Sequence, residues 1–343
     1  MRGLALFLSV SFGGGLLAQA GRPHYASLGN FKLDHGERIE HCRLAYRTRG
    51  RLNRGRTNAI LFPTWFTGTS RQLLSLAGPN AQSMLDTRKW FVIFVDALGD
   101  GVSSSPSNSR LQPRLRFPRF SLRDMVRAEY RLARHRLHLR HLHAVIGISM
   151  GGMQAFQWAV SYPGYMKEVI PIVGSPRPDA YDLLQLRVFI QMIREDRHWH
   201  HGNYATPPQL YDLWDFMALH LTSPGHLARS VPRESFARFL RRSEHPQPEF
   251  DANDLLYQAQ AIQRLDVARP YRDSLSAAAA RVTARMLIVP SRQDHMVSPL
   301  PAERFARLVH AQTFLLTSDC GHIANGCQAD QLNPLIRRFL TKY

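Results

Sequence analysis

Cysteine is scarce in this chain of 343 residues, where it occurs only as Cys42, Cys320 and Cys327. The spacing of the three fits no zinc site, which argues against a zinc-stabilised domain. An odd number also means that at least one cysteine cannot be matched within the chain. Cys320 and Cys327 are close enough in sequence to form a disulfide, and buried thiols are the alternative interpretation.

Lysine and acidic side chains are also few. The chain holds only four lysines, so arginine supplies almost all of the positive charge behind the net +18. The arginines are scattered along the sequence, and no known nucleic-acid-binding motif accompanies them. We therefore expect an arginine-rich surface and no nucleic-acid partner, while an anionic surface or substrate stays open.

No apolar run is long enough to predict a membrane-spanning helix. The longest, at residues 3–17, follows the positive Arg2 and precedes Ala18-Gln19-Ala20, which has the small-x-small pattern of a cleavage site. We therefore predict a signal peptide at residues 1–20, cleaved near Ala20, and an exported protein without stable membrane insertion. An uncleaved anchor helix is the alternative.

The rest of the chain predicts an α/β fold. Hydrophobic residues make up 44% of the sequence, which is enough for a large core. Continuous β-branched runs typical of buried parallel strands alternate with helical segments, so we expect a mostly parallel central sheet with helices on both faces. The runs lie at 58–62, 90–96, 143–148, 168–173, 285–289 and 313–316, after two earlier strands expected at 31–40 and 42–48.

Residues 176–282 are helical in character and rich in aromatic side chains. A connection between a strand and the next helix normally takes a few residues, so this segment is too long to be one. We predict a helical lid insertion at 176–282 that divides the core into residues 21–175 and 283–343.

The strongest single motif is Gly147-Ile148-Ser149-Met150-Gly151, a G-x-S-x-G pattern with a predicted strand before it and a predicted helix after it. Glycines on either side of the serine let the strand and the helix approach closely. The tight turn exposes the Ser149 hydroxyl at the start of the helix and directs the backbone N–H of Met150 toward a developing oxyanion. The motif therefore predicts a nucleophilic serine, against the alternative of a helix-capping one.

A nucleophilic serine needs a base, and this kind of turn predicts the chain order serine, acid, histidine. Asp294 follows the apolar run at 285–289, and His322 follows the last one. We expect Asp294 to orient His322. Asp319 is the competing acid, and His295 and His310 are the competing bases.

The loop after residues 58–62 should supply the second oxyanion donor, which we expect to be the backbone N–H of Trp65 or Phe66. The run His198-Trp199-His200-His201 does not converge on one point in either a helix or a strand, so no metal site is predicted. The glycine-rich loop at 96–103 lacks both the P-loop lysine and the dinucleotide spacing, and no cofactor is expected.

Taken with the early Leu44-Ala45-Tyr46, the loop Phe66-Thr67-Gly68 and Tyr162-Pro163, the stretch GISMGGMQAFQWA at 147–159 resembles the homoserine O-acetyltransferase family of α/β-hydrolase-fold enzymes. The similarity covers nearly the whole chain after residue 20. It implies the α/β-hydrolase fold, acylation of Ser149, and Asp294 and His322 as acid and base.

Two positions depart from what the resemblance implies for homoserine. The family carries an acidic residue directly after the histidine, where this chain has Ile323, and a lid arginine for the substrate carboxylate, where this chain has Phe216. With Thr67, these are the predicted substrate-binding residues. The family's acyl-coenzyme A donor is expected in the cytoplasm, whereas this chain is expected to be exported.

We therefore predict an exported ester hydrolase that acts on a small-molecule ester or thioester through an acyl-enzyme. The alternatives are an O-acyltransferase of the homoserine type and an inactive binding protein on the same fold. A homodimer is compatible with the sequence.

Overall fold

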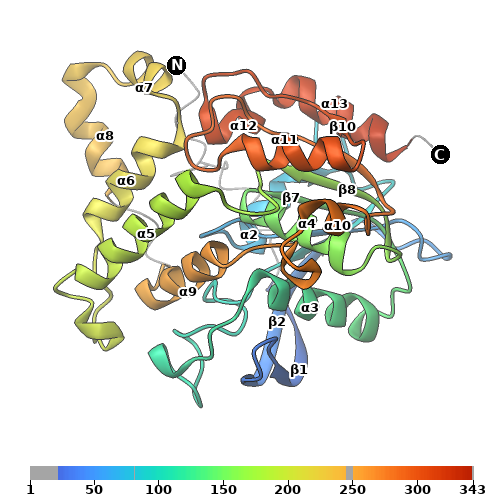
Figure 1. Cartoon of the computed structure of the whole chain (residues 1–343), viewed down its shortest axis with the longest axis horizontal. Coiled ribbons are helices and arrows are strands. Elements are labelled where there is room, and N and C mark those ends of the chain that lie inside the picture. Colours follow the sequence, from blue (N-terminus) through green and yellow to red (C-terminus); the bar gives the residue numbers. More distant parts are fainter. Residues whose placement is uncertain (1–21, 81, 245–249, 342–343) are drawn as a thin grey trace.

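The computed structural model describes residues 22–80, 82–244 and 250–341 (Figure 1). The predicted signal peptide at 1–20 lies outside these residues. None of the described helices is both long enough and apolar enough to cross a membrane.

The centre of the described chain is an eight-stranded sheet. Its first two strands pair antiparallel with each other, and the second pairs antiparallel with β6, while the remaining neighbours are parallel. The predicted mostly parallel sheet is therefore confirmed. The order across the sheet is β1 (His24–Lys32), β2 (Arg38–Arg49), β6 (Phe91–Val95), β3 (Ala59–Pro63), β7 (Leu142–Ile148), β8 (Met166–Ile172), β9 (Arg285–Ile288) and β10 (Gln312–Thr313).

The first and last predicted strands are corrected by the structure. The strand expected at 31–40 is interrupted, because residues 33–37 form the turn of the β1–β2 hairpin. Gly36 has φ +102°, a backbone conformation that glycine adopts readily and other residues avoid. The run at 313–316 provides only Thr313 to β10, and Leu316 makes an isolated bridge to Ser291.

Alternating side chains on the strands build a separate core on each face of the sheet. In β3, Leu61 packs with one core and Ile60 and Phe62 with the other. The first core also contains α3 (Leu122–Arg131), α4 (Met150–Ser161) and α11 (Pro299–Leu308), and the second contains α2 (Ser70–Leu73) and α13 (Ala329–Leu340). The predicted helices on both faces are confirmed.

The long segment between β8 and β9 contains no strand among its described residues. In Figure 1, α5 to α8 extend beyond one side of the sheet, while α9 lies nearer the core. Eleven of the twelve residues of α9 are buried, and the Gln258 side chain donates to the backbone oxygen of Leu98. The helices are α5 (Ala180–Glu195), α6 (Tyr211–Leu221), α7 (Pro224–Ser230), α8 (Phe236–Ser243), α9 (Ala252–Gln263) and α10 (Leu275–Ala279).

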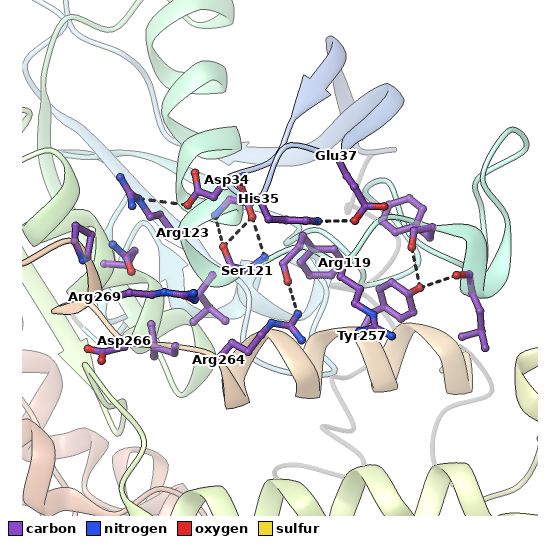
Figure 2. A pocket seen from close by; sticks show the side chains of 18 of the residues that line it. Asp34, His35, Glu37, Arg119, Ser121, Arg123, Tyr257, Arg264, Asp266 and Arg269 are labelled. Atoms are coloured by element: carbon purple, nitrogen blue, oxygen red, sulfur yellow. Dashed lines mark hydrogen bonds and ion pairs between the residues drawn. The ribbon is translucent and has the colours of Figure 1, made fainter. Parts of the chain in front are cut away.

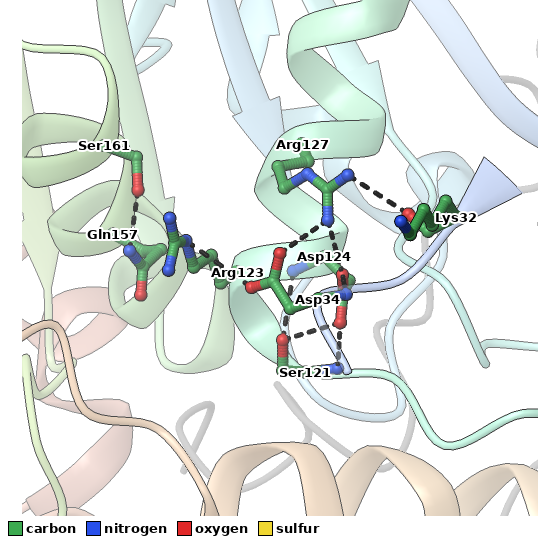
Figure 3. A network of polar contacts seen from close by, with 8 residues as sticks. All are labelled: Lys32, Asp34, Ser121, Arg123, Asp124, Arg127, Gln157 and Ser161. Atoms are coloured by element: carbon green, nitrogen blue, oxygen red, sulfur yellow. Dashed lines mark hydrogen bonds and ion pairs between the residues drawn. The ribbon is translucent and has the colours of Figure 1, made fainter. Parts of the chain in front are cut away.

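A polar network fastens the hairpin turn to α3 (Figure 3). The backbone N–H of Asp34 donates to the Asp124 carboxylate at 2.9 Å, and Arg127 bridges Asp34 and Asp124. Asp124 also accepts from the Ser121 N–H in the capping box that begins α3. The network therefore anchors the edge of the sheet to the helix that packs against α4.

Candidate active site

Ser149 lies at the junction of β7 and α4 in the strained backbone geometry that the motif predicts. Its φ of 56° and ψ of −122° lie in a region that L-residues rarely adopt. Neighbouring glycines make the turn sterically feasible: a Cβ at Gly147 would overlap the carbonyl of Gly151, and one at Gly151 would lie 2.6 Å from the oxygen of Pro63. The glycines thus let α4 approach both β7 and the end of β3.

The side chains of Ser149, His322 and Asp294, far apart in the sequence, are connected by two successive hydrogen bonds. The Ser149 Oγ lies 2.9 Å from Nε2 of His322, and Nδ1 of His322 lies 2.8 Å from Oδ2 of Asp294. The His322 and Asp294 side chains are almost fully buried, at 5% and 1% exposed. This is the arrangement in which a base can take the serine proton while a carboxylate fixes the imidazole tautomer.

The Asp294 carboxylate is itself held by the loop that follows β9. Its second oxygen, Oδ1, accepts from the backbone N–H groups of Met296 and Val297, at 2.9 and 2.8 Å. Both oxygens are therefore engaged, which leaves the carboxylate one orientation toward His322. The competing acid, Asp319, instead pairs with His226 and Arg229 of α7.

The loop that carries His322 is restrained on two sides. His322 lies in the short 3₁₀ helix η7 (Gly321–Ile323), and a disulfide joins Cys320 to Cys327 across it. The Ser291 hydroxyl donates to the oxygen of Gly321 at 2.7 Å. Sequence alone left the disulfide and buried thiols as alternatives, and the structure has the disulfide. Cys42 remains a buried thiol, and burial raises its pKa to about 12.

The segment before α7 also contacts this loop. The Ser223 N–H donates to the oxygen of Asp319 at 3.2 Å, and a Cβ at Gly321 would lie 2.9 Å from the Cα of Thr222. The helical segment between β8 and β9 is thus in direct contact with the loop that positions His322.

Of the predicted oxyanion residues, Met150 and Phe66 line the cavity at Ser149. Met150 is the first residue of α4, so its backbone N–H has no partner within the helix. The Gln154 side chain ties the two predicted donor segments together by donating to the oxygens of Thr64 and Met150, at 3.2 and 3.3 Å. Phe66 lines the same cavity as Ser149 and Met150, whereas the neighbouring Trp65 packs its ring over Gly68.

A cavity of about 70 Å³ adjoins Ser149 between the core and the helical segment. Most of its lining is apolar, and only Asp182 and Gln185 of α5 add other polar side chains. The residues that line it are Phe66, Ser149, Met150, Met153, Pro178, Asp182, Gln185, Leu186, Phe189, Phe216, Met217, Ile262, Met296 and Val297.

The predicted substrate-binding residues are distributed unevenly around this cavity. Phe216 lines it, but Thr67 and Ile323 are absent from its described lining. Ile323 is 4% exposed and packs in the core that contains α13. Asp182 and Gln185 were not predicted, because no sequence motif marks them.

Asp182 brings a carboxyl group with an altered pKa into this cavity. Burial raises its pKa to about 7, and the negative charges of Asp179 and Asp294 act in the same direction. The carboxyl accepts the backbone N–H of Ser298 at 2.8 Å. Below neutral pH the cavity therefore carries little charge.

A larger hollow of about 1040 Å³ lies between the hairpin turn, α3 and α9 (Figure 2). Arg119 and Arg264 are among its lining residues, and Arg264 donates to the oxygen of Phe120. None of its lining residues lines the cavity at Ser149. Its size therefore does not identify it with the chemistry of Ser149.

Comparisons with known proteins agree with this geometry. The sequence profile of the alpha/beta hydrolase fold family matches residues 79–326. A probable esterase of Corynebacterium glutamicum is 31% identical, with 78% of this chain and 80% of that protein covered. A homoserine O-acetyltransferase of Geotalea daltonii is 30% identical, with 91% and 95% covered.

The structural comparison points the same way. The solved structure of the acetyl esterase MekB superposes with a TM-score of 0.86 at 27% identity, covering 94% of this chain and 97% of that one. The fold, the family profile and the relatives are in agreement. The chain therefore belongs to the α/β-hydrolase fold family, in its homoserine O-acetyltransferase-like branch, and is an enzyme of the hydrolase or acyltransferase type.

Proposed function

We propose that this protein is an exported ester hydrolase that forms an acyl-enzyme on Ser149. The observation that carries the proposal is the hydrogen-bonded chain from Ser149 Oγ through His322 to Asp294, with Ser149 in a strained turn at the start of α4. Esterases among the relatives support hydrolysis. Export rests on the sequence pattern of residues 1–20.

The proposed reaction has two steps of the same kind. Nε2 of His322 takes the Ser149 proton as Oγ attacks the ester carbonyl, and then gives it to the departing alcohol. Water then loses a proton to His322 as it attacks the acyl-enzyme carbonyl, and His322 returns this proton to Ser149 Oγ as the ester bond to the serine breaks and the acid leaves. The backbone N–H groups of Met150 and Phe66 would stabilise the oxyanion in both steps, by about 3 kcal/mol for each donor.

The size of the cavity favours a small acyl group. A dry cavity of about 150 Å³ accommodates benzene, which has six carbon atoms. By the same ratio, the roughly 70 Å³ beside Ser149 has room for about three non-hydrogen atoms, the number in an acetyl group. The aromatic and aliphatic walls, among them Phe66, Phe189 and Phe216, favour uncharged ester substrates.

Helices α5 and α6 contribute several of these walls, so we propose that residues 176–282 act as the lid of the site. The segment supplies Phe189 of α5 and Phe216 and Met217 of α6. An apolar lid excludes water from the oxyanion and strengthens its hydrogen bonds.

The second candidate is transfer of the acyl group to homoserine. The 30% identity with a homoserine O-acetyltransferase over 91% of this chain favours it. Against it, the described cavity lining contains no arginine or lysine for the amino-acid carboxylate. We therefore place hydrolysis first.

The deciding experiment compares the purified protein from residue 21 onward with its Ser149→Ala variant. Turnover of p-nitrophenyl acetate and butyrate is followed with and without homoserine. Hydrolysis that is lost in Ser149→Ala and is indifferent to homoserine supports the hydrolase. Acceleration by homoserine with formation of O-acylhomoserine supports the transferase, and turnover that survives Ser149→Ala contradicts both.

A further inference from the structure

We propose that Gln185 is a specificity-determining residue that binds a hydroxyl group on the ester substrate. This inference rests on the proposed function, since it concerns the same cavity. It goes beyond that function because it assigns the substrate a second polar group, close to its ester. The preferred substrates would then be hydroxylated short-chain esters rather than simple alkyl esters.

The Gln185 amide at the cavity wall has no hydrogen-bond partner among the described residues. Gln185 is 8% exposed, and neither its Oε1 nor its Nε2 has a hydrogen-bond partner among the described residues. It lines the cavity that contains Ser149. Buried polar side chains almost always have partners, so an amide that has none beside a reactive serine is a candidate ligand-binding group.

Helix α5 gives this amide a fixed position. Asp182, Gln185, Leu186 and Phe189 all line the cavity, and their spacing of three, four and seven residues places them on one face of the helix. The helix begins with a capping box formed by Asp179 and Asp182. A polar group on a packed helix is held in place before the substrate arrives, which favours selective binding.

Of the two polar side chains that α5 adds to the cavity wall, only Gln185 lacks a hydrogen-bond partner among the described residues. Asp182 lies one turn earlier on the same face, yet its two oxygens accept the backbone N–H groups of Ser298 and Asp179, at 2.8 and 3.4 Å. Asp182 therefore has partners within the protein, whereas the Gln185 amide has none among the described residues.

The chemistry of the amide selects a hydroxyl. An amide offers a donor at Nε2 and an acceptor at Oε1, and one hydroxyl can accept from the first and donate to the second. An ammonium group could only donate, and a carboxylate could only accept. Either charge would also be buried against apolar walls such as Phe66 and Phe189, which disfavours both.

The test uses two pairs of esters in which a hydroxyl replaces a methyl group. Ethyl glycolate and ethyl propionate place the difference on the acyl side, and 2-hydroxyethyl acetate and propyl acetate place it on the alcohol side. Hydrolysis is measured as kcat/KM for the wild type, Gln185→Leu and Gln191→Leu. Gln191 is the matched control, because it lies on the same helix but lines a different hollow.

We expect the wild type to prefer the hydroxylated member of at least one pair by about 10- to 100-fold, the range for one or two hydrogen bonds to a buried group. Gln185→Leu should bring that ratio to about one or below, because the substrate hydroxyl loses its hydrogen-bond partner. Gln191→Leu should keep the wild-type ratio. Gln185→Leu should also melt at the same temperature as the wild type or higher, because it removes an unsatisfied buried amide, whereas a purely structural glutamine would lower the melting temperature.

Two results would overturn the inference. One is a wild-type kcat/KM that is about equal for the hydroxylated and the alkyl ester in both pairs, a result that can be obtained without any variant. The other is a hydroxyl preference that persists in Gln185→Leu or, if that variant does not fold, in Gln185→Met. In either case Ser149-dependent hydrolysis of propyl acetate would leave the proposed function intact. Absence of ester turnover in the wild type would instead contradict the proposed function, and the specificity for hydroxylated esters would fall with it.

Discussion

Replacing Glu129 with glutamine should stabilise the protein at pH 8 and have little effect at pH 4.5. Glu129 lies in α3 and is fully buried, where Oε2 accepts the indole N–H of Trp158 of α4 at 2.6 Å. Burial raises the pKa of its carboxyl from 4.5 to about 8. Glutamine keeps the shape and the acceptor of the protonated acid but cannot ionise.

The size of the effect follows from the two pKa values. Between pH 4.5 and pH 8 the folded protein keeps a proton that the unfolded chain has released, so stability falls as pH rises. The loss is about 1.4 kcal/mol for each pH unit, which amounts to about 5 kcal/mol over the window. The proton on Glu129 contributes its full share to the stability of the wild type below pH 4.5, and this contribution is lost above pH 8. The variant lacks this dependence.

The assay is denaturant unfolding of the wild type, Glu129→Gln and a control, Glu195→Gln, at pH 4.5, 6 and 8. Glu195 is an exposed residue at the end of α5, so its replacement removes the same charge without affecting the core. The difference between Glu129→Gln and the wild type should grow steadily with pH. Parallel pH profiles for these two proteins would refute a buried, protonated Glu129.

Three further predictions concern the site and its support. Asp294→Asn should lower kcat by about 10³- to 10⁴-fold with little change in KM, because asparagine holds the His322 imidazole in the wrong tautomer. In steady-state kinetics, a loss of tenfold or less would exclude the role assigned to Asp294. The double variant Cys320→Ser/Cys327→Ser should lose about 2–3 kcal/mol of its free energy of unfolding, as the loop-entropy relation predicts for a sequence separation of seven residues. Equal stability of the variant and the wild type in denaturant unfolding would contradict this. Gly147→Ala should abolish soluble folded protein, because its Cβ would overlap the carbonyl of Gly151 in the first turn of α4. The control Gly164→Ala has open space around it and should melt like the wild type. A normal melting curve for Gly147→Ala would contradict the turn at Ser149.

The sequence predicted best those elements whose local residue pattern allows only one place in the fold, namely the buried strands and the turn at Ser149. Continuous apolar runs can be satisfied only by strands buried on both faces, so the positions of β3, β6, β7 and β8 were predicted closely. The turn at Ser149 was predictable for a related reason, since Gly147 and Gly151 are needed for the close approach of the backbones. The pairing of His322 with Asp294, 28 residues apart, followed from the expected chain order of serine, acid and histidine.

Features that depend on how helices pack were not predictable. The sequence also predicted a strand across residues 33–37, where the structure has a hairpin turn with Gly36 at positive φ. Gln185 is one of several polar residues on α5, and only the surrounding helices determine that it faces the cavity without a partner among the described residues. Ile323 was predicted to bind the substrate because it directly follows His322, but its side chain packs in the core that contains α13.

The contact between Thr222 and Gly321 has a consequence for protein engineering. Because a Cβ at Gly321 would lie 2.9 Å from the Cα of Thr222, the helical segment and the His322 loop must match each other at the level of the backbone. A chimaera that takes residues 176–282 from a relative would inherit a foreign surface at this junction. Exchanging segment and loop together, with the Cys320–Cys327 bridge, would preserve the fit, so residues 319–327 belong to the transferable module even though they lie outside residues 176–282.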